Sequence, residues 1–226
     1  MLELYPSKAP RLLKDPAELA TMPHIGVDEA GRGCLAGPVS AAAVLFPDGL
    51  DSTALFPGLT DSKKLTAAKR EILYPLIRAN TIWAIGLAWP VEIDGVNILN
   101  ATFRAMSRAV SRLRCPRPLP RLLVDGNHPI REDAWKAATA MPLPPQSPII
   151  KGDSLVPAIS AASILAKVFR DRLMARLDRR YPGYGFAIHK GYGTQEHRDA
   201  IAELGFSAMH RKTFNATGRE RQGSFL

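Results

Sequence analysis

The chain has 226 residues, 46% of them hydrophobic and 23% charged, a composition typical of a folded globular protein. Its formal net charge of +9 favours a polyanion such as nucleic acid as the partner. Two cysteines without CxxC spacing argue against a disulfide framework and a zinc site, and no apolar run reaches the ~18 residues of a membrane span, so a cytoplasmic protein is expected.

The first part of the chain predicts a polar lead-in followed by strands and one helix. Two apolar runs flank a glycine-rich turn, which favours adjacent antiparallel strands. Thr60 or Asp61 is expected to cap the helix, and Pro75 to end or bend it. In chain order, these elements are the flexible lead-in 1–22, the strands His24–Asp28 and Val39–Phe46, a loop over 47–60, the helix to about Ala79 and a strand over Ile82–Ala88.

The middle of the chain predicts a helix, a strand and a proline-rich excursion. Val96, Leu99 and Phe103 begin a run of apolar residues at helical spacing, with arginines on the other faces. Four prolines within 142–148 predict a long surface segment. In chain order, the elements are the helix Ile93–Leu113, the strand Arg121–Asp125, a short helix Glu132–Ala140, the proline-rich segment and a short fifth strand Ile149–Lys151.

The last part of the chain predicts two helices separated by a glycine- and aromatic-rich loop. They are the helix Ser160–Arg179, the loop 181–193, a helix from Thr194 to about Leu204 and a disordered tail after Gly218. Strands that are first adjacent and then alternate with helices predict an α/β fold with a mixed central sheet flanked by helices. We expect one main domain over 23–193 and a small C-terminal helical appendage with its tail over 194–226.

Four carboxylates are predicted to meet at one edge of this sheet. Asp28, Glu29 and Asp125 lie at the carboxyl ends of predicted strands, and Asp153 follows the fifth strand by two residues. Adjacent strand residues point to opposite faces, so the first strand must end or twist for both Asp28 and Glu29 to reach one centre. Crowded carboxylates repel one another unless a cation neutralises them, so the set predicts a Mg²⁺ or Mn²⁺ site. The alternative is that each acid is solvated or caps a local turn.

Other residues suggest contact with a sugar-phosphate chain. Gly31, Arg32 and Gly33 form either a tight turn or a loop that lets the backbone approach a nucleic acid closely. Tyr192 either stacks on a sugar or base, or fills the edge of the core. The remaining candidates are basic residues that contact phosphate or belong to a solvated face: Lys63, Lys64, Arg170, Arg172, Arg176, Arg179, Arg180 and Lys190.

Six stretches of the sequence form an ordered set of motifs. They are Gly26–Gly33 with Leu35–Val39, Asp61–Leu65, Val124–Gly126, Lys151–Asp153, Ile159–Val168 with Arg170–Asp171, and Tyr181–Gly185 through His189–Thr194. Together and in this order, they resemble the bacterial ribonuclease HII family of the ribonuclease H-like superfamily. The resemblance covers most of residues 24–215.

The resemblance implies a ribonuclease H-like catalytic domain and an endonuclease that depends on Mg²⁺ or Mn²⁺. The implied enzyme cleaves the RNA strand of RNA–DNA hybrids and nicks 5′ of single ribonucleotides in duplex DNA, leaving a 5′-phosphate and a 3′-hydroxyl. A monomer without membrane association is expected. The implied site residues are the acidic tetrad Asp28, Glu29, Asp125 and Asp153, the 2′-hydroxyl-binding Gly31, Arg32 and Gly33, and the sugar-stacking Tyr192. Lys63 is expected as a further substrate contact because of its charge.

Two rival functions remain open at this point. One is a catalytically silent protein that binds hybrids, although keeping four acids is unfavourable for a pure phosphate binder. The other is a DNA-strand-transfer enzyme of the same superfamily, which would share the metal chemistry but not the Gly-Arg-Gly and Tyr192 features. Residues 205–214 depart from the commoner family pattern, and this departure is expected to affect the appendage rather than the metal centre.

Overall fold

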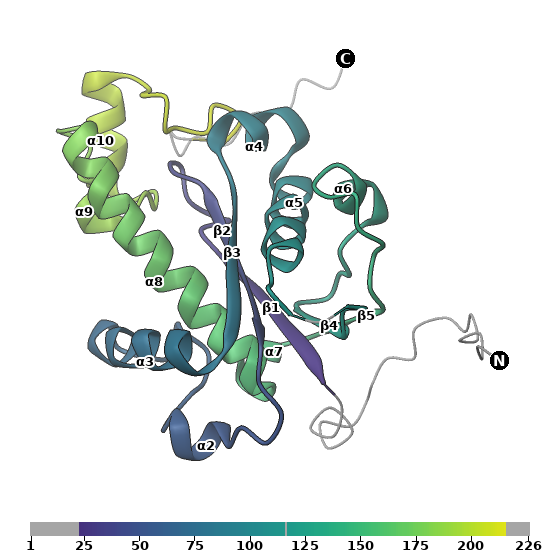
Figure 1. Ribbon diagram of the computed structural model, residues 1–226. Coiled ribbons are helices and arrows are strands. Elements are labelled where there is room, and N and C mark those ends of the chain that lie inside the picture. The colour runs from purple at the N-terminus through teal and green to yellow at the C-terminus, as the bar shows by residue number, and fades with distance from the viewer. Residues whose placement is uncertain (1–22, 116, 216–226) are drawn as a thin grey trace.

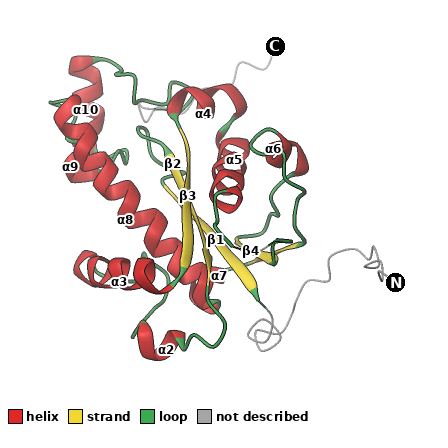
Figure 2. Ribbon diagram, viewed as in Figure 1, coloured by secondary structure: helices red, strands yellow, loops and turns green. Residues whose placement is uncertain are grey.

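The computed structural model describes residues 23–115 and 117–215 and has a five-stranded sheet at its centre (Figures 1 and 2). The predicted lead-in 1–22 and the tail after Gly218 lie outside these residues. The strands are β1 (His24–Ala30), β2 (Val39–Leu45), β3 (Ile82–Ala88), β4 (Arg121–Asp125) and β5 (Gln146–Ile149), in the spatial order β3-β2-β1-β4-β5. The pairs β1–β2 and β2–β3 are antiparallel, whereas β1–β4 and β4–β5 are parallel. The predicted mixed sheet is confirmed.

Helices cover both faces of the sheet, with α5 and α8 on opposite sides (Figure 1). The helices are α2 (Ser52–Leu55), α3 (Ala67–Asn80), α4 (Pro90–Val96), α5 (Ile98–Ser111), α6 (Glu132–Lys136), α7 (Gly152–Leu155), α8 (Pro157–Arg180), α9 (Phe186–His189) and α10 (Gln195–Leu204). None of the helices described here combines the length and the apolar character needed to cross a bilayer.

Side-chain alternation along β1 and β2 forms two core layers. Ile25 and Val27 of β1 pack with Phe103 and Met106 of α5, whereas Ala42 of β2 joins the cluster beneath α3 and α8. Both strands are therefore covered on both faces, which explains why their sequences are nearly continuous apolar runs.

Gly26 allows β1 to lie directly against α8. A Cβ atom at this position would lie 2.2 Å from the carbonyl carbon of Ala158 and 2.4 Å from the backbone nitrogen of Ile159. Both atoms belong to the helix backbone, which cannot move aside as a flexible side chain can. The absence of a side chain at Gly26 therefore fixes how closely the sheet and α8 approach one another.

The predicted start of the first long helix is wrong. Thr66, not Thr60 or Asp61, caps α3, and its hydroxyl accepts a hydrogen bond from the Lys69 N–H. The Asp61 carboxylate instead accepts from the Lys63 N–H at 2.8 Å and forms a tight turn ahead of the helix. The helix also continues through Pro75 to Asn80.

Two further predictions differ from the structure because backbone conformation interrupts the sequence pattern. The helix predicted over Ile93–Leu113 is two helices, since Asn97 has a positive φ of 68° and its side chain caps α5. The fifth strand is Gln146–Ile149 instead of Ile149–Lys151, and it contains Pro148. An edge strand tolerates proline because one side of its backbone needs no ladder partner. The short helices α2 and α9 lie in segments predicted as loop.

The segment after α10 returns toward the sheet and reaches α4 (Figure 1). The Asp94 carboxylate of α4 accepts hydrogen bonds from the backbone N–H groups of Lys212 and Thr213. Met209 of this segment packs against the buried cluster that includes Ala36 and Met174. The division into a main domain and an appendage at residue 194 stays a prediction.

Candidate metal centre

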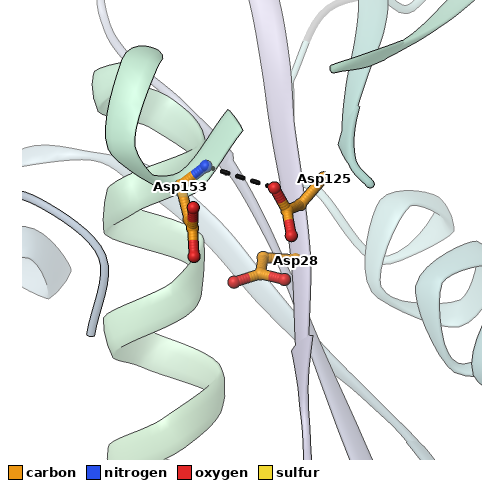
Figure 3. A group of neighbouring side chains, drawn as sticks. All are labelled: Asp28, Asp125 and Asp153. Atoms are coloured by element: carbon orange, nitrogen blue, oxygen red, sulfur yellow. Dashed lines mark hydrogen bonds between the residues drawn. The ribbon is translucent and has the colours of Figure 1, made fainter. Parts of the chain in front are cut away.

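The carboxylates of Asp28, Asp125 and Asp153, here called the acidic group, converge near the carboxyl ends of β1 and β4 (Figure 3). The parallel pairing of β1 and β4 places Val27 beside Val124, so Asp28 and Asp125 follow at matching positions. Asp153 comes from α7, which begins three residues after β5 ends. One carboxylate oxygen from each residue lies within 4.8 Å of the others.

Asp153 reaches the group through a helix that sequence analysis did not predict. Its backbone N–H donates to the Asp125 Oδ1 at 3.2 Å (Figure 3). A Cβ atom at Gly152 would lie 2.6 Å from the Ile159 Cδ1 and 3.3 Å from the Asp125 Oδ1, so the glycine lets α7 approach β4 closely. Asp28 and Asp153 are only 5% and 6% exposed.

The acidic group is electrostatically unfavourable without a cation. Burial raises the pKa of Asp28 well above its ordinary value, and the negative charges of Glu29 and Asp125 raise it further. Burial and the charges of Asp125 and Asp61 likewise raise the pKa of Asp153. Crowded, buried oxygen ligands with unneutralised charge fit a hard divalent cation such as Mg²⁺ or Mn²⁺.

Glu29 lies outside the acidic group. Strand β1 continues to Ala30 instead of ending at Asp28 as predicted, so Glu29 points to the face opposite Asp28. There it lines a recess with Phe103 of α5 and Asp125, and it pairs with Arg32 at 3.4 Å. Burial is the main cause of its raised pKa, which Arg32 lowers and the nearby Asp125 charge raises. The structure thus brings together three of the four predicted acids, with Glu29 beside Asp125 on the other face.

Two serines of α8 hold the acidic group in place. The Ser160 hydroxyl donates to the Asp153 carbonyl at 2.7 Å. Ser163, one turn further on, forms a hydrogen bond with the Asp28 carboxylate and lies 2.8 Å from the Ser62 hydroxyl. Neither serine was predicted as a site residue. The available signal was two hydroxyls at positions i and i+3 in an otherwise apolar stretch of the helix.

Lys63 lies in the turn ahead of α3, next to the acidic group. Burial lowers its pKa, but the surrounding carboxylates, including all three of the acidic group, outweigh burial and raise it. The neighbouring Lys64 Nζ donates to the Ser154 hydroxyl of α7 at 3.1 Å, which ties this turn to the segment that carries Asp153. Both lysines are exposed, so they add positive charge at the rim of the site.

Gly31, Arg32 and Gly33 begin the loop between β1 and β2, here called the 31–38 loop. Gly31 has a φ of +91°, and a Cβ atom there would lie 2.0 Å from the Arg170 Nε, so only glycine fits. A Cβ atom at Gly33 would meet nothing within 4 Å. Arg32 and Gly33 are exposed and open to a ligand.

Tyr192 lies beside this loop and next to Lys167 of α8. Its ring is 42% exposed and faces the Lys167 Nζ, which is 5.4 Å from the ring centre. Lys167 follows Ser163, the partner of Asp28, by four residues on α8, a separation of ~6 Å. The Leu35 N–H donates to the Gly191 carbonyl at 2.8 Å and joins the loop to the residue before Tyr192.

Comparisons with known proteins agree on one family. The family model described as ribonuclease HII matches residues 25–217. The chain is 57% identical to a ribonuclease HII of Nitratidesulfovibrio vulgaris over 202 residues, covering 88% of this chain and 89% of that one. It is 49% identical to a ribonuclease HII of Syntrophotalea carbinolica, covering 95% and 97%. The crystal structure of ribonuclease H2 from Pyrococcus horikoshii OT3 is similar at 28% identity with a TM-score of 0.68, covering 87% and 95%.

Proposed function

The chain belongs to the ribonuclease HII family of ribonuclease H endonucleases, and on that premise we propose that it cleaves the RNA strand of RNA–DNA hybrids. We further propose that it nicks 5′ of single ribonucleotides in duplex DNA and leaves a 5′-phosphate and a 3′-hydroxyl. The observation that carries the proposal is the convergence of Asp28, Asp125 and Asp153 next to the turn that exposes Arg32 and Gly33.

The proposed metal ligands are Asp28, Asp125 and Asp153, with Glu29 as a fourth acid close to Asp125. When bound there, Mg²⁺ or Mn²⁺ supplies an activated water and stabilises the leaving oxygen of the phosphodiester. Ser163 of α8 orients the Asp28 carboxylate, and Ser160 holds the backbone carbonyl of Asp153. The N–H of Asp153 in turn donates to the Asp125 carboxylate.

The remaining predicted residues are proposed to bind the substrate around this centre. Lys63 is positioned to attract a backbone phosphate toward the acidic group. Gly31, Arg32 and Gly33 are proposed to recognise the ribose 2′-hydroxyl, the group that distinguishes RNA from DNA. Tyr192 is proposed to stack on the sugar at the junction. A cytoplasmic monomer remains the expected form of the protein.

Cleavage of a DNA duplex that contains one ribonucleotide tests the proposed function. We expect a single nick with Mg²⁺ or Mn²⁺, no nick in EDTA and no cleavage of the all-DNA duplex. End-labelling of the products should show a 5′-phosphate and a 3′-hydroxyl. Binding without nicking would instead support the silent hybrid-binding protein, and equal cleavage of the all-DNA duplex would support the strand-transfer enzyme.

Replacing Tyr192 by alanine is expected to lower kcat/KM at the ribonucleotide junction by ~10- to 100-fold, the range for losing one stacked ring. The melting temperature should change little because the ring is 42% exposed. Tyr192→Phe is the matched control, since it keeps the ring and removes only the hydroxyl that bonds to Cys34. A large drop in the melting temperature of Tyr192→Ala, with junction activity lost only in proportion to the unfolded fraction, would show that the ring serves packing.

A further inference from the structure

Two fully buried arginines hold the 31–38 loop through its backbone carbonyls. Arg170 of α8 is 0% exposed and Arg211, from the segment after α10, is 1% exposed. Arg170 was predicted as a candidate phosphate contact, and its burial shows that this prediction is wrong. Both guanidinium groups are directed at the loop that contains the Gly-Arg-Gly turn.

Arg211 bonds directly to the Gly-Arg-Gly turn. Its Nη2 donates to the Gly31 carbonyl and its Nη1 to the Arg32 carbonyl, each at 2.7 Å. Its Nε and Nη2 also donate to the Gly37 carbonyl at 3.1 and 2.9 Å. One side chain thus joins both ends of the loop.

Arg170 holds the second half of the same loop. Its Nη2 donates to the Ala36 carbonyl and its Nε to the Pro38 carbonyl, each at 2.9 Å. Its Nη1 donates to the Lys190 carbonyl at 2.8 Å, two residues before Tyr192. Arg170 therefore links the loop to the segment that carries the proposed stacking residue.

Carbonyl groups, not carboxylates, satisfy these two cations. Neither Arg170 nor Arg211 forms an ion pair within residues 23–115 and 117–215. Burial lowers the pKa of Arg211 to about 10, so the side chain still carries its charge at neutral pH. A buried charge that lacks a carboxylate partner depends on its hydrogen bonds, so it strongly favours the loop conformation that provides them.

The direction of these carbonyls determines what the loop presents on its outer side. In a planar trans peptide unit, the carbonyl of one residue and the N–H of the next point in opposite directions. The carbonyls of Gly31 and Arg32 face Arg211, so the N–H groups of Arg32 and Gly33 face away from it. Both residues are exposed, and neither N–H has a recorded partner in the described part of the chain.

We propose that Arg211 and Arg170 are positioning residues that hold the N–H groups of Arg32 and Gly33 in place for the ribose oxygen of the substrate. This inference rests on the proposed function, because it assigns those N–H groups to recognition of the 2′-hydroxyl. The segment after α10 then supplies part of the specificity site. Residues 205–214, whose departure from the family pattern is expected to affect the appendage rather than the metal centre, would then also affect recognition of the substrate.

Lysine cannot replace these arginines. A guanidinium group carries five N–H donors in a rigid planar fork and can bond to several carbonyls in different directions at once. A lysine ammonium offers three donors from a single atom. Arg211→Lys and Arg170→Lys therefore keep the positive charge but lose the planar set of donors that reaches several carbonyls at once.

The test compares binding of two duplexes in EDTA, where no cleavage occurs: one all-DNA and one with a single ribonucleotide. The wild type should bind the ribonucleotide duplex more tightly. In Arg211→Lys and Arg170→Lys, that ratio of dissociation constants should fall by about 10-fold while binding to all-DNA is unchanged. Arg131→Lys is the matched control, because Arg131 is exposed, pairs with the nearby Asp133 and has no role in the proposed site.

Several results would overturn the inference. Loss of affinity for both duplexes in equal proportion would show that the arginines only stabilise the fold. The inference would also be overturned by a wild type that nicks the ribonucleotide duplex yet binds both duplexes equally. A wild type that nicks no duplex at all contradicts the proposed function instead. If the lysine variants do not fold, amide hydrogen exchange of the wild type is the deciding measurement. The ribonucleotide duplex should protect the Arg32 and Gly33 amides more than the all-DNA duplex does. Equal protection by the two duplexes would contradict the inference.

Discussion

Replacing Asp28 by asparagine is expected to slow cleavage of an RNA–DNA hybrid by about 1,000-fold, equivalent to ~4 kcal/mol of transition-state stabilisation. The asparagine amide keeps the size of the side chain and can still accept the hydrogen bond that the Glu29 N–H donates to Oδ1 at 2.7 Å. What it loses is the negative charge that a divalent cation requires. Single-turnover rates with saturating Mg²⁺ or Mn²⁺ measure the effect, and hybrid binding should be largely retained.

The same substitution is expected to raise the melting temperature of the metal-free protein at neutral pH. The folded-state pKa of Asp28 is raised by burial and by neighbouring negative charges, so its stabilising contribution is present at low pH. That contribution is lost as the pH rises through the folded-state pKa, when the carboxylate must ionise among other acids. Asparagine carries no charge, so the variant avoids the unfavourable free energy of ionising a buried carboxylate next to other acids. Added Mg²⁺ or Mn²⁺ should stabilise the wild type more than the variant.

Asp48→Asn is the control for these measurements, because it removes one exposed negative charge from the loop after β2, away from the acidic group. It should leave both the cleavage rate and the melting temperature near the wild-type values. An Asp28→Asn variant that cleaves at a near-normal rate would exclude Asp28 as a metal ligand. A variant that melts lower without metal would show that its hydrogen bonds outweigh the charge repulsion.

Replacing Gly26 by alanine is expected to destabilise the protein by about 3 kcal/mol, or roughly 6–12 °C in melting temperature. The added methyl group would lie 2.2 Å from a backbone carbon of Ala158, so β1 and α8 must separate. Asp28 lies two residues further along the same face of β1, and its contact with Ser163 of α8 should weaken as well. Chemical denaturation and a cleavage assay at low temperature measure the two effects.

Gly95→Ala in α4 is the matched control for the Gly26 substitution. A Cβ atom at Gly95 would meet nothing within 4 Å, and alanine favours a helix by up to ~1 kcal/mol over glycine. This variant should be as stable as the wild type or more so. A Gly26→Ala variant that loses less than about 1 kcal/mol would mean that the spacing of β1 and α8 adjusts easily.

The sequence predicts the centre of the fold well because buried strands carry strong local signals. β1 and β2 are nearly continuous apolar runs, and the Asp28 and Asp125 carboxylates follow from the ends of such runs. The split at Asn97 is not predictable in the same way, because one left-handed residue changes the chain direction without altering the apolar spacing.

The partners of polar residues could not be predicted from the sequence. Arg170 lies among other charges on a helix, and periodicity alone does not show that its guanidinium enters the core to meet the 31–38 loop. The face to which Glu29 points depends on β1 continuing to Ala30, two residues beyond the predicted end of the strand at Asp28. Strand ends are set by pairing with neighbouring strands, which local sequence specifies poorly.

The hydrogen bond from Arg211 to Gly31 joins residues that are 180 positions apart in the chain, so the ribosome adds its two partners at different times. A nascent polypeptide acquires Asp28, Asp125 and Asp153 well before Arg211 is translated. During that interval, it holds the ligands for a cation but lacks a side chain that shapes the Gly-Arg-Gly turn. If Arg211 acts as proposed, selectivity for ribose would thus depend on a residue that is translated after all three aspartates of the acidic group.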